Sequence, residues 1–220
     1  MAGWEERAPD WMAWARTPGH DAYWTYRHAF FELLPAAPPA WRVLEVGCGE
    51  GRVARDLAAR GHRVTALDAS PTLVAAAAEA DAASDYVLGD AMALPFDDAA
   101  FDLVVAYNVL MDVEDMPQAV TEASRVLAPA GHLCACVTHP LADAGQWATE
   151  EGETRFVLHR SYLRGGPFEA TEERGGLRMT FDGFTHSMES YARVFEEAGL
   201  VIEAMREPAG APPSGACQVR

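Results

Sequence analysis

The sequence predicts an α/β fold built on a doubly wound, mostly parallel sheet. From residue 41 onward, short apolar runs alternate with helical patterns, as repeated strand–helix units do. A glycine-rich turn, GCGEG over residues 47–51, follows the first apolar run, and an acidic residue ends the second run and follows the third. With 220 residues, the chain is long enough for one domain with a sizeable core.

The strands and helices of this sheet follow one another at regular spacing. Strands are predicted at residues 42–46, 62–67, 85–89, 101–107 and 131–139, the third short and at an edge, and the fourth apolar throughout, as a strand buried on both faces is. Helices are predicted between them, over residues 51–60, from about residue 71, and over residues 116–127. A further helix is expected over residues 187–200 and a sixth strand over residues 200–205.

Segments outside the alternation define the expected domain organisation. Residues 1–40 form an N-terminal helical lid, with a helix that starts after an N-cap at Asp21 and stops at Pro35. Residues 41–139 form the α/β core, residues 140–185 an inserted cap with short strands at 155–159 and 177–181, and residues 186–207 complete the core. Residues 208–220 are rich in Pro and Gly and are expected to be a flexible tail.

Charge and composition exclude several function classes. The formal net charge is −16, which argues against a nucleic-acid partner, and the cluster Arg52, Arg55, Arg60 and Arg63 is interpreted as a solvated helix face. No apolar run reaches the roughly 18–20 residues of a membrane helix, and the N-terminus lacks a secretory signal, so we expect a cytoplasmic protein. Cysteines 48, 134, 136 and 217 lack metal-ligand spacing, so core thiols and no metal site are expected.

The GCGEG turn lies where an open parallel sheet binds ligands, at the carboxyl end of the first strand. Glycines there permit unusual backbone angles and close approach, although a tight strand-to-helix turn alone would also explain them. Asp68 ends the second strand, where a carboxylate accepts hydrogen bonds from ribose hydroxyls. Asp90 follows the third strand, where it could accept from an adenine amino group.

Together these segments resemble class I S-adenosylmethionine-dependent methyltransferases with their Rossmann-like fold, and specifically the small-molecule methyltransferases of the broad ubiquinone-biosynthesis-like group. The matching stretches are VLEVGCGEG, ALDAS, GDAMALPFDDAAFDLVVA and LAPAGHLCACV, which span roughly residues 41–138. FTHSMESYARVFEEAGLVIEAM is similar to the later helix and strand of the family. The GxGxG pattern favours this cofactor over NAD, whose fingerprint is GxGxxG.

The resemblance implies S-adenosylmethionine as cofactor, S-adenosylhomocysteine as product, and a role for each matching position. The implied cofactor-binding residues are Glu45, Gly47, Gly49, Gly51, Asp68, Ala69, Asp90, Ala91 and Tyr107. Two departures from the family stand out: the antiparallel seventh strand is expected to be missing, short or truncated, and AYNVLMDVEDM stands where many relatives carry a histidine-rich stretch at strand four.

Candidate acceptor-binding residues come from the lid, the end of strand four and the insert. Tyr23, Tyr26, Arg27 and Phe30 share one face of the lid helix, where they either stack on a flat acceptor or simply pack on the sheet. Asn108 and Asp112 follow strand four and could orient the acceptor, although Asp112 could equally cap a helix. From the insert, Tyr162 is an equally ambiguous candidate.

Three residues are candidates for catalysis. His139 follows strand five and is the first candidate for a general base, although it could instead cap the next turn. His186 is the second candidate for a base. Tyr107 would lie near the reacting sulfur. The resulting hypothesis is methyl transfer to a small, aromatic or amphipathic metabolite on oxygen, nitrogen or carbon, by a monomer or homodimer. The alternatives are a non-catalytic cofactor-binding regulator or partner subunit, an NAD-dependent oxidoreductase and an RNA methyltransferase.

Overall fold

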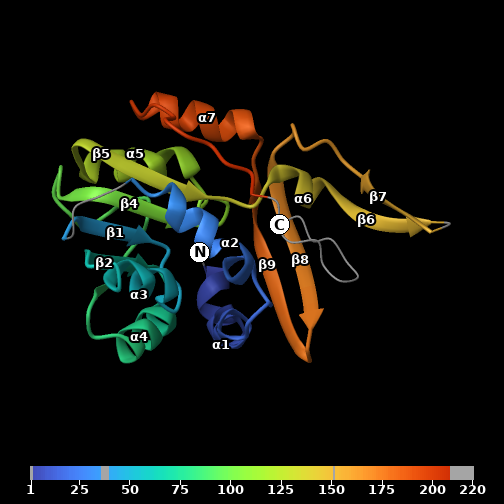
Figure 1. Ribbon diagram of the computed structural model, residues 1–220, viewed down its shortest axis with the longest axis horizontal. Coiled ribbons are helices and arrows are strands. Elements are labelled where there is room, and N and C mark those ends of the chain that lie inside the picture. The colour runs from blue at the N-terminus through green and yellow to red at the C-terminus, as the bar shows by residue number, and fades with distance from the viewer. Residues whose placement is uncertain (1, 36–39, 151, 209–220) are drawn as a thin grey trace.

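A five-stranded parallel sheet forms the centre of the computed structural model, which describes residues 2–35, 40–150 and 152–208 (Figure 1). The strand order is β3-β2-β1-β4-β5, as a doubly wound sheet requires. The strands are β1 (Arg42–Val46), β2 (Arg63–Asp68), β3 (Asp85–Leu88), β4 (Phe101–Tyr107) and β5 (Leu127–Cys136). The predicted fold class and all five strands of the core are therefore confirmed.

The direction of chain progression reverses at β1. This strand pairs in parallel with β2 on one side and with β4 on the other, so that Val46 lies opposite both Leu67 and Ala106. The turn that follows Val46 is the GCGEG loop, which therefore lies at the switch point of the sheet, where ligands of open α/β folds bind.

Helices cover both faces of the sheet, because successive residues of each buried strand point to opposite faces. Leu44, Val104 and Ala106 belong to the core cluster under α5 and α7, whereas Val43, Val105 and Tyr107 belong to the cluster with α2 and α3. Figure 1 shows α5 and α7 on one side of the sheet and α3 and α4 on the other. The helices are α2 (Ala22–Leu33), α3 (Arg52–Ala58), α4 (Pro71–Ala80), α5 (Met116–Val126) and α7 (Met188–Glu197).

Local sequence signals fix where these helices begin. The Asp21 side chain accepts a hydrogen bond from the Tyr23 backbone N–H at 2.7 Å and caps α2, as predicted. Ser70 caps α4 in the same way and is followed by Pro71 at the first helical position. The predicted helices at residues 21–34, 51–60, 71 onward, 116–127 and 187–200 are thus confirmed, apart from small shifts at their ends.

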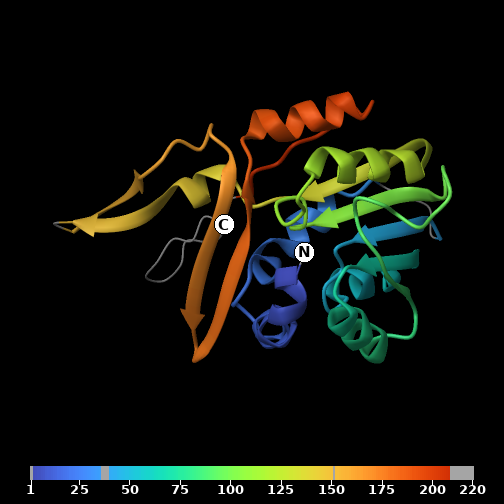
Figure 2. The same ribbon diagram turned by 180° about the vertical axis from the view of Figure 1, so that it is seen from behind.

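The insert after β5 forms two antiparallel ribbons, not isolated short strands. It contains α6 (Pro140–Ala144), β6 (Gly145–Glu150), β7 (Glu153–Leu158), β8 (Gly166–Arg174) and β9 (Leu177–Thr185). β6 pairs with β7 and β8 with β9, so the segments predicted at residues 155–159 and 177–181 gain partner strands that the sequence pattern did not indicate. Figure 2 shows the β8–β9 ribbon beside the N-terminal helices and the β6–β7 ribbon projecting away from them.

An N-terminal helix, α1 (Ala2–Arg16), lies between the sheet and the β8–β9 ribbon (Figure 1). The rings of Trp11 and Trp14 meet the ring of Phe181 on β9 at 6.3 and 6.0 Å. The N-terminal segment is helical as predicted, and its role as a lid stays a prediction; its first helix, which contains Pro9, had no sequence prediction of its own.

The predicted sixth strand is wrong. Residues 200–208 form no strand, and Val201 is 83 % exposed. The segment instead runs beside the chain of β5 through two side-chain contacts, Glu203 with His132 at 3.5 Å and Glu207 with His139 at 2.9 Å. β5 is an edge strand of the sheet, but no strand among the described residues covers the other side of this segment. Most of the predicted tail, including Cys217, lies outside the described residues.

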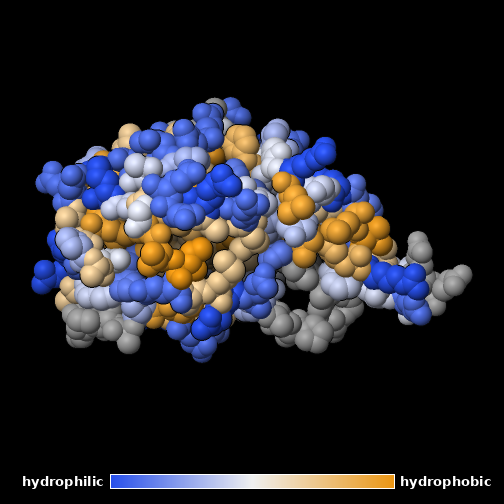
Figure 3. Space-filling view, turned by 90° about the horizontal axis from the view of Figure 1, so that it is seen from above, coloured by the Kyte–Doolittle hydropathy of each residue, from blue (hydrophilic) through white to orange (hydrophobic). Residues whose placement is uncertain are grey.

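The described part of the surface is mixed in character. Figure 3 shows apolar side chains gathered on the projecting end of the molecule, where Trp147, Val157 and Leu158 of the β6–β7 ribbon are 38, 39 and 52 % exposed. Among the described helices, none is long and apolar enough to span a membrane.

Candidate active site at the strand ends

The glycine loop is shaped by close contacts within the protein. Gly47, Gly49 and Gly51 all have positive φ angles, of 69°, 54° and 82°. A Cβ atom on Gly47 would lie only 2.3 Å from Cγ2 of Val109, in the turn after β4. The protein itself therefore requires glycine at position 47, because the turn after β4 passes too close to the Gly47 backbone to leave room for a Cβ atom.

Asp68 ties the glycine loop to the end of β2. Its Oδ2 accepts a hydrogen bond from the Gly49 N–H at 2.7 Å, and its Oδ1 accepts one from the Ser70 N–H at 2.9 Å. Burial raises the pKa of the Asp68 carboxyl group, and these N–H groups counteract the rise. Because each carboxylate oxygen can accept two hydrogen bonds, both oxygens keep capacity for a ligand hydroxyl.

Asp90 lies at the end of β3, beside a buried Ala91. One oxygen of Asp90 accepts a hydrogen bond from the Met92 N–H at 2.9 Å, which fixes the carboxylate in a tight turn. Ala69, after the end of β2, is exposed. The structure thus brings the carboxyl ends of β1, β2 and β3 together as the sequence predicted.

Glu45 is a buried carboxyl group within this edge. The residue is only 2 % exposed, and its Oε2 has no hydrogen-bond partner among the described residues. Burial raises the pKa of Glu45 well above its usual value, although the nearby Arg52 guanidinium acts in the opposite direction. A ligand N–H or ammonium group would satisfy the unpaired oxygen.

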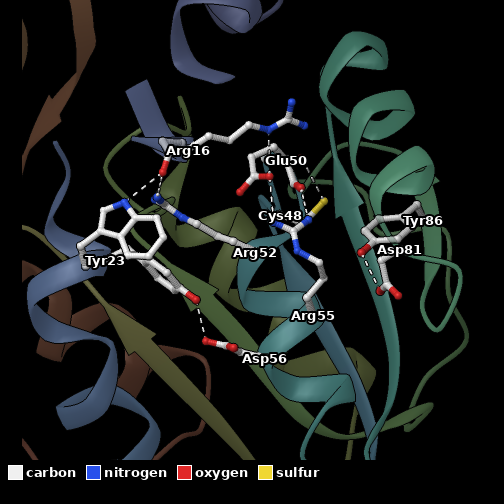
Figure 4. Close-up of polar contacts among 12 residues, drawn as sticks. Arg16, Tyr23, Cys48, Glu50, Arg52, Arg55, Asp56, Asp81 and Tyr86 are labelled. Atoms are coloured by element: carbon white, nitrogen blue, oxygen red, sulfur yellow. Dashed lines mark hydrogen bonds and ion pairs between the residues drawn. The ribbon is translucent and has the colours of Figure 1, made fainter. Parts of the chain in front are cut away.

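A network of arginines joins the glycine loop to the N-terminal helices (Figure 4). Arg52 forms an ion pair with Asp21, and its guanidinium lies over the Tyr23 ring at 4.4 Å. Glu50, which is only 3 % exposed, is paired with Arg55 at 2.8 Å and with Arg16 at 3.5 Å. The prediction of a solvated arginine face is therefore wrong for Arg52 and Arg55, because Arg52 is paired with Asp21 of the lid segment and Arg55 with the buried Glu50 of the glycine loop.

Helix α1 covers this edge of the sheet. The Glu5 carboxylate accepts hydrogen bonds from the hydroxyl groups of Ser70 and Thr72, at the start of α4. These bonds hold the pKa of Glu5 below its usual value. On the next turns of the helix, the Trp11 indole lies 3.0 Å from where a Cβ of Gly49 would be. Sequence reasoning missed both residues, because no motif marks them.

Tyr107 is buried under the lid helix, not open to a ligand. Its ring meets Phe30 at 4.8 Å and Tyr23 at 6.0 Å, and all three side chains are buried. The hydroxyl group of Tyr107 has no hydrogen-bond partner among the described residues, and burial raises its pKa. The Tyr23 hydroxyl donates to Asp56 at 2.5 Å. Tyr23 and Phe30 thus lie on the face of α2 that packs on the sheet, which is the alternative to acceptor binding given in the sequence analysis.

The remaining lid and insert candidates lie apart from one another. Arg27 places its guanidinium over the Tyr23 and Trp24 rings, each at 5.7 Å, and Tyr26 is partly buried on the same helix. Tyr162 lies in the turn after β7. Tyr162 thus belongs to the insert, whereas Tyr26 and Arg27 belong to α2, and the roles of all three as acceptor-binding residues stay predictions.

The two candidate bases differ in what their ring nitrogens contact. His139 caps α6, with Nδ1 accepting from the Leu141 N–H at 3.2 Å and Nε2 lying 2.9 Å from an oxygen of Glu207. In contrast, Nε2 of His186 is buried without a partner among the described residues, and burial lowers the pKa of this imidazole. A neutral, unpaired imidazole is better prepared to accept a proton than one whose two nitrogens are engaged.

The turn after β4 carries Asn108 and Asp112. Asn108 has a φ angle of 53°, unusual outside glycine, and its N–H continues the ladder to the Cys136 carbonyl at 2.9 Å. Asp112 caps no helix; α5 is capped by Asp115. Instead Asp112 lines a cavity of about 430 Å³ between this turn, α1 and the β8–β9 ribbon.

The residues at this edge fit S-adenosylmethionine. Asp68 and Asp90 offer acceptors for ribose hydroxyls and an adenine amino group, and Glu45 offers a buried unpaired oxygen for a charged amine. As for metal ions, no group of three or more His, Cys, Asp or Glu side chains among the described residues has the arrangement of a metal site.

Comparisons with known proteins agree with this geometry. Residues 44–135 match the sequence profile of a methyltransferase domain family. Malonyl-[acyl-carrier protein] O-methyltransferases are similar in sequence: that of Serratia marcescens is 38 % identical over 136 residues, 60 % of this chain and 53 % of the relative. That of Erwinia pyrifoliae is 42 % identical over 103 residues, 46 % of this chain and 39 % of the relative.

A solved structure extends the likeness to nearly the whole chain. The S-adenosylmethionine dependent methyltransferase from Mesorhizobium loti superposes with a TM-score of 0.71 at 25 % identity, covering 87 % of this chain and 86 % of the other. The curated relatives, in contrast, are matched over about half of their length or less. The sequence match over residues 44–135 and this superposition thus make the chain similar to S-adenosylmethionine-dependent methyltransferases in sequence and in fold.

Proposed function

We propose that this protein transfers a methyl group from S-adenosylmethionine to a small acceptor with an aromatic or amphipathic body. The observation that supports this most directly is the convergence of the glycine loop, Asp68 and Asp90 at one sheet edge, beside a separate cavity lined by Asp112. When bound, S-adenosylmethionine supplies a methyl group on a cationic sulfonium, which a nucleophile takes by in-line displacement.

The chain's own residues position the two partners. In this proposal Asp68 accepts the ribose hydroxyls, Asp90 accepts the adenine amino group, and Glu45 accepts from the amino-acid end. Gly47, Gly49 and Gly51 keep the backbone clear of side chains, with Ala69 and Ala91 against the adenine. Alignment of the reacting groups contributes several kcal/mol to such reactions, and these fixed hydrogen-bond acceptors provide the alignment of the donor.

Helix α1 and the β8–β9 ribbon exclude water from the strand ends. Trp11 and Trp14 pack against Phe181, and Glu5 fastens α1 to the start of α4. A dry site strengthens the electrostatic interactions inside it and protects the donor from water.

Where the acceptor loses a proton, we assign its removal to His186. This imidazole is neutral and has an unpaired buried nitrogen, and it follows the cavity residue Phe184 by two positions. His139 would first have to give up its bonds to Leu141 and Glu207. Tyr107 would have to leave the core to reach a ligand, so we propose for it a packing role beneath the site.

A second candidate function comes from the sequence relatives. Several of them are malonyl-[acyl-carrier protein] O-methyltransferases, which raises methylation of a carboxyl group on a carrier-bound acyl chain as an alternative. Such a reaction would require a carrier protein as partner, and the acidic lining of the cavity next to the site disfavours an anionic acceptor.

Methyl transfer can be distinguished from mere cofactor binding by following the methyl group. The protein is incubated with S-adenosylmethionine labelled in its methyl group and with panels of phenols, amines and carboxylates, including a malonyl carrier protein. We expect label in a small phenol or amine, together with S-adenosylhomocysteine. If the cofactor binds and no label leaves it with any class of acceptor, the non-catalytic alternative is correct.

A further inference from the structure

A cavity beside the cofactor edge has a composition that points to the charge of its ligand. It has a volume of about 430 Å³ and lies between the start of α1, the turn after β4 and the β8–β9 ribbon. This size suits a small molecule. Three aromatic side chains, Trp4, Phe168 and Phe184, provide its apolar lining.

All charged residues among the described lining of this cavity are acidic. Asp112, Glu114, Glu169 and Asp182 line it, and no Arg or His does. Aromatic faces together with carboxylates favour organic cations, because the ring face carries negative charge and the carboxylate pairs with the cation. An anionic ligand would be repelled by the carboxylate of Asp112.

Asp112 is the carboxylate placed deepest in this arrangement. The residue is partly buried, and its carboxyl group accepts no hydrogen bond from the described residues. Gly183 of β9 faces it: a Cβ at Gly183 would lie 3.2 Å from Oδ1 of Asp112. Burial raises the pKa of Asp112 well above its usual value, and the charge of Asp68 adds to the effect.

The rim carboxylates already hold a cation of the protein itself. Arg7 of α1 is paired with Asp182 and lies 3.8 Å from an oxygen of Glu169. The side chains of Glu169 and Asp182 are 71 and 41 % exposed, so this pairing belongs to the entrance. Among the described residues no ion pair joins Asp112 to a cation, so a partly buried carboxyl group lines the cavity without a counter-ion.

We propose that this cavity binds an acceptor that carries a protonated amine on a flat apolar body, with the ammonium paired to Asp112 and the body against Phe168 and Phe184. The inference rests on the proposed function and narrows its acceptor to arylalkylamines. The ammonium is the group that the cavity recognises, and it need not be the atom that is methylated. Asp112 lies near enough to Asp68 for their charges to interact, so the bound molecule would lie next to the cofactor edge.

Three probes of equal size and different charge test the proposal by calorimetric titration. They are tyramine, its neutral alcohol analogue tyrosol, and 4-hydroxyphenylacetate, each titrated with and without S-adenosylhomocysteine. We expect tyramine to bind at least about tenfold more tightly than tyrosol, since one buried ion pair exceeds about 1.4 kcal/mol, and the acid to bind most weakly.

Two matched substitutions locate the effect. Asp112→Asn should remove the preference for tyramine and leave the affinity for S-adenosylhomocysteine within about twofold, whereas Asp85→Asn, on the exposed start of β3, should leave both unchanged. Equal binding of the three probes, binding of none, or a preference that survives Asp112→Asn would overturn the proposal. Failure of S-adenosylhomocysteine to bind would instead overturn the proposed function, since the tyramine titration does not depend on it.

Discussion

Some residues at this site lower the stability of the folded protein, and Asp112 is the clearest case. An unpaired carboxyl group that is enclosed by protein loses hydration when the chain folds. Its folded-state pKa is raised, so the folded protein binds more protons than the unfolded chain between the unfolded pKa, near 4, and the higher folded pKa. The contribution of Asp112 to stability therefore decreases as pH rises through that window.

Asp112→Asn should consequently stabilise the protein at neutral pH, by about 1 kcal/mol or a few °C in Tm. The gain should shrink as pH approaches 4, where the aspartate becomes protonated in both states. Thermal unfolding of both proteins between pH 4 and pH 8 measures this. A lower Tm for the variant at pH 7.5 would show that Asp112 is held by partners and is not an unsatisfied binding group.

At the scale of secondary-structure elements, α1 controls access to the strand ends. It is fastened to the start of α4 through Glu5, and its other side rests on β9. Because the Trp11 indole lies so close to Gly49, we expect a ligand as large as S-adenosylmethionine to enter when α1 moves. Lid motions of this kind commonly set the rates of binding and release.

Glu5→Gln keeps the size of the side chain and weakens its hydrogen bonds to Ser70 and Thr72. We expect association and dissociation rates for S-adenosylhomocysteine both to rise, about threefold to tenfold, because an open lid becomes more populated. Stopped-flow fluorescence of the nearby tryptophans follows both rates. Glu6→Gln, on the exposed neighbouring position, is the control; identical rates for wild type and Glu5→Gln would show that α1 is not the lid.

Elements also show what could be predicted from the sequence and what could not. The core strands were predictable because each is an apolar run with a turn signal at both ends, and Asp68 and Asp90 were found because they directly adjoin such runs. Partners distant in sequence were not predictable. From the sequence alone, Arg52 is expected at the surface, and its ion pair with Asp21 is visible only in the folded chain. The cavity likewise forms from residues 3–4, 112–114 and 167–184, which are far apart in the sequence.

Two further misses have specific physical causes. α1 contains Pro9, which normally ends a helix, yet the helix forms because its aromatic face packs on β9. Residues 200–205 have the apolar content of a strand, but strand formation also depends on a partner that covers the strand, and no such partner exists among the described residues. The segment contacts the rest of the protein through the side chains of Glu203 and Glu207.

At the scale of the whole molecule, the proposed cofactor edge and the proposed acceptor cavity are neighbours, since the charges of Asp68 and Asp112 interact. The sheet places the glycine loop at its switch point, α1 and the β8–β9 ribbon cover it, and the acidic cavity opens beside the covered edge. A net charge of −16 gives the whole surface a field that favours approach of cations, an effect that salt weakens.

The most direct test of the account is a calorimetric titration of the protein with S-adenosylhomocysteine, beside NADH and with Asp68→Ala as the variant. We predict micromolar binding of S-adenosylhomocysteine, a loss of about tenfold to a hundredfold in the variant because two hydrogen bonds to a carboxylate disappear, and no binding of NADH. Binding of NADH alone, or affinity for S-adenosylhomocysteine that Asp68→Ala leaves unchanged, would contradict the cofactor site described for this edge.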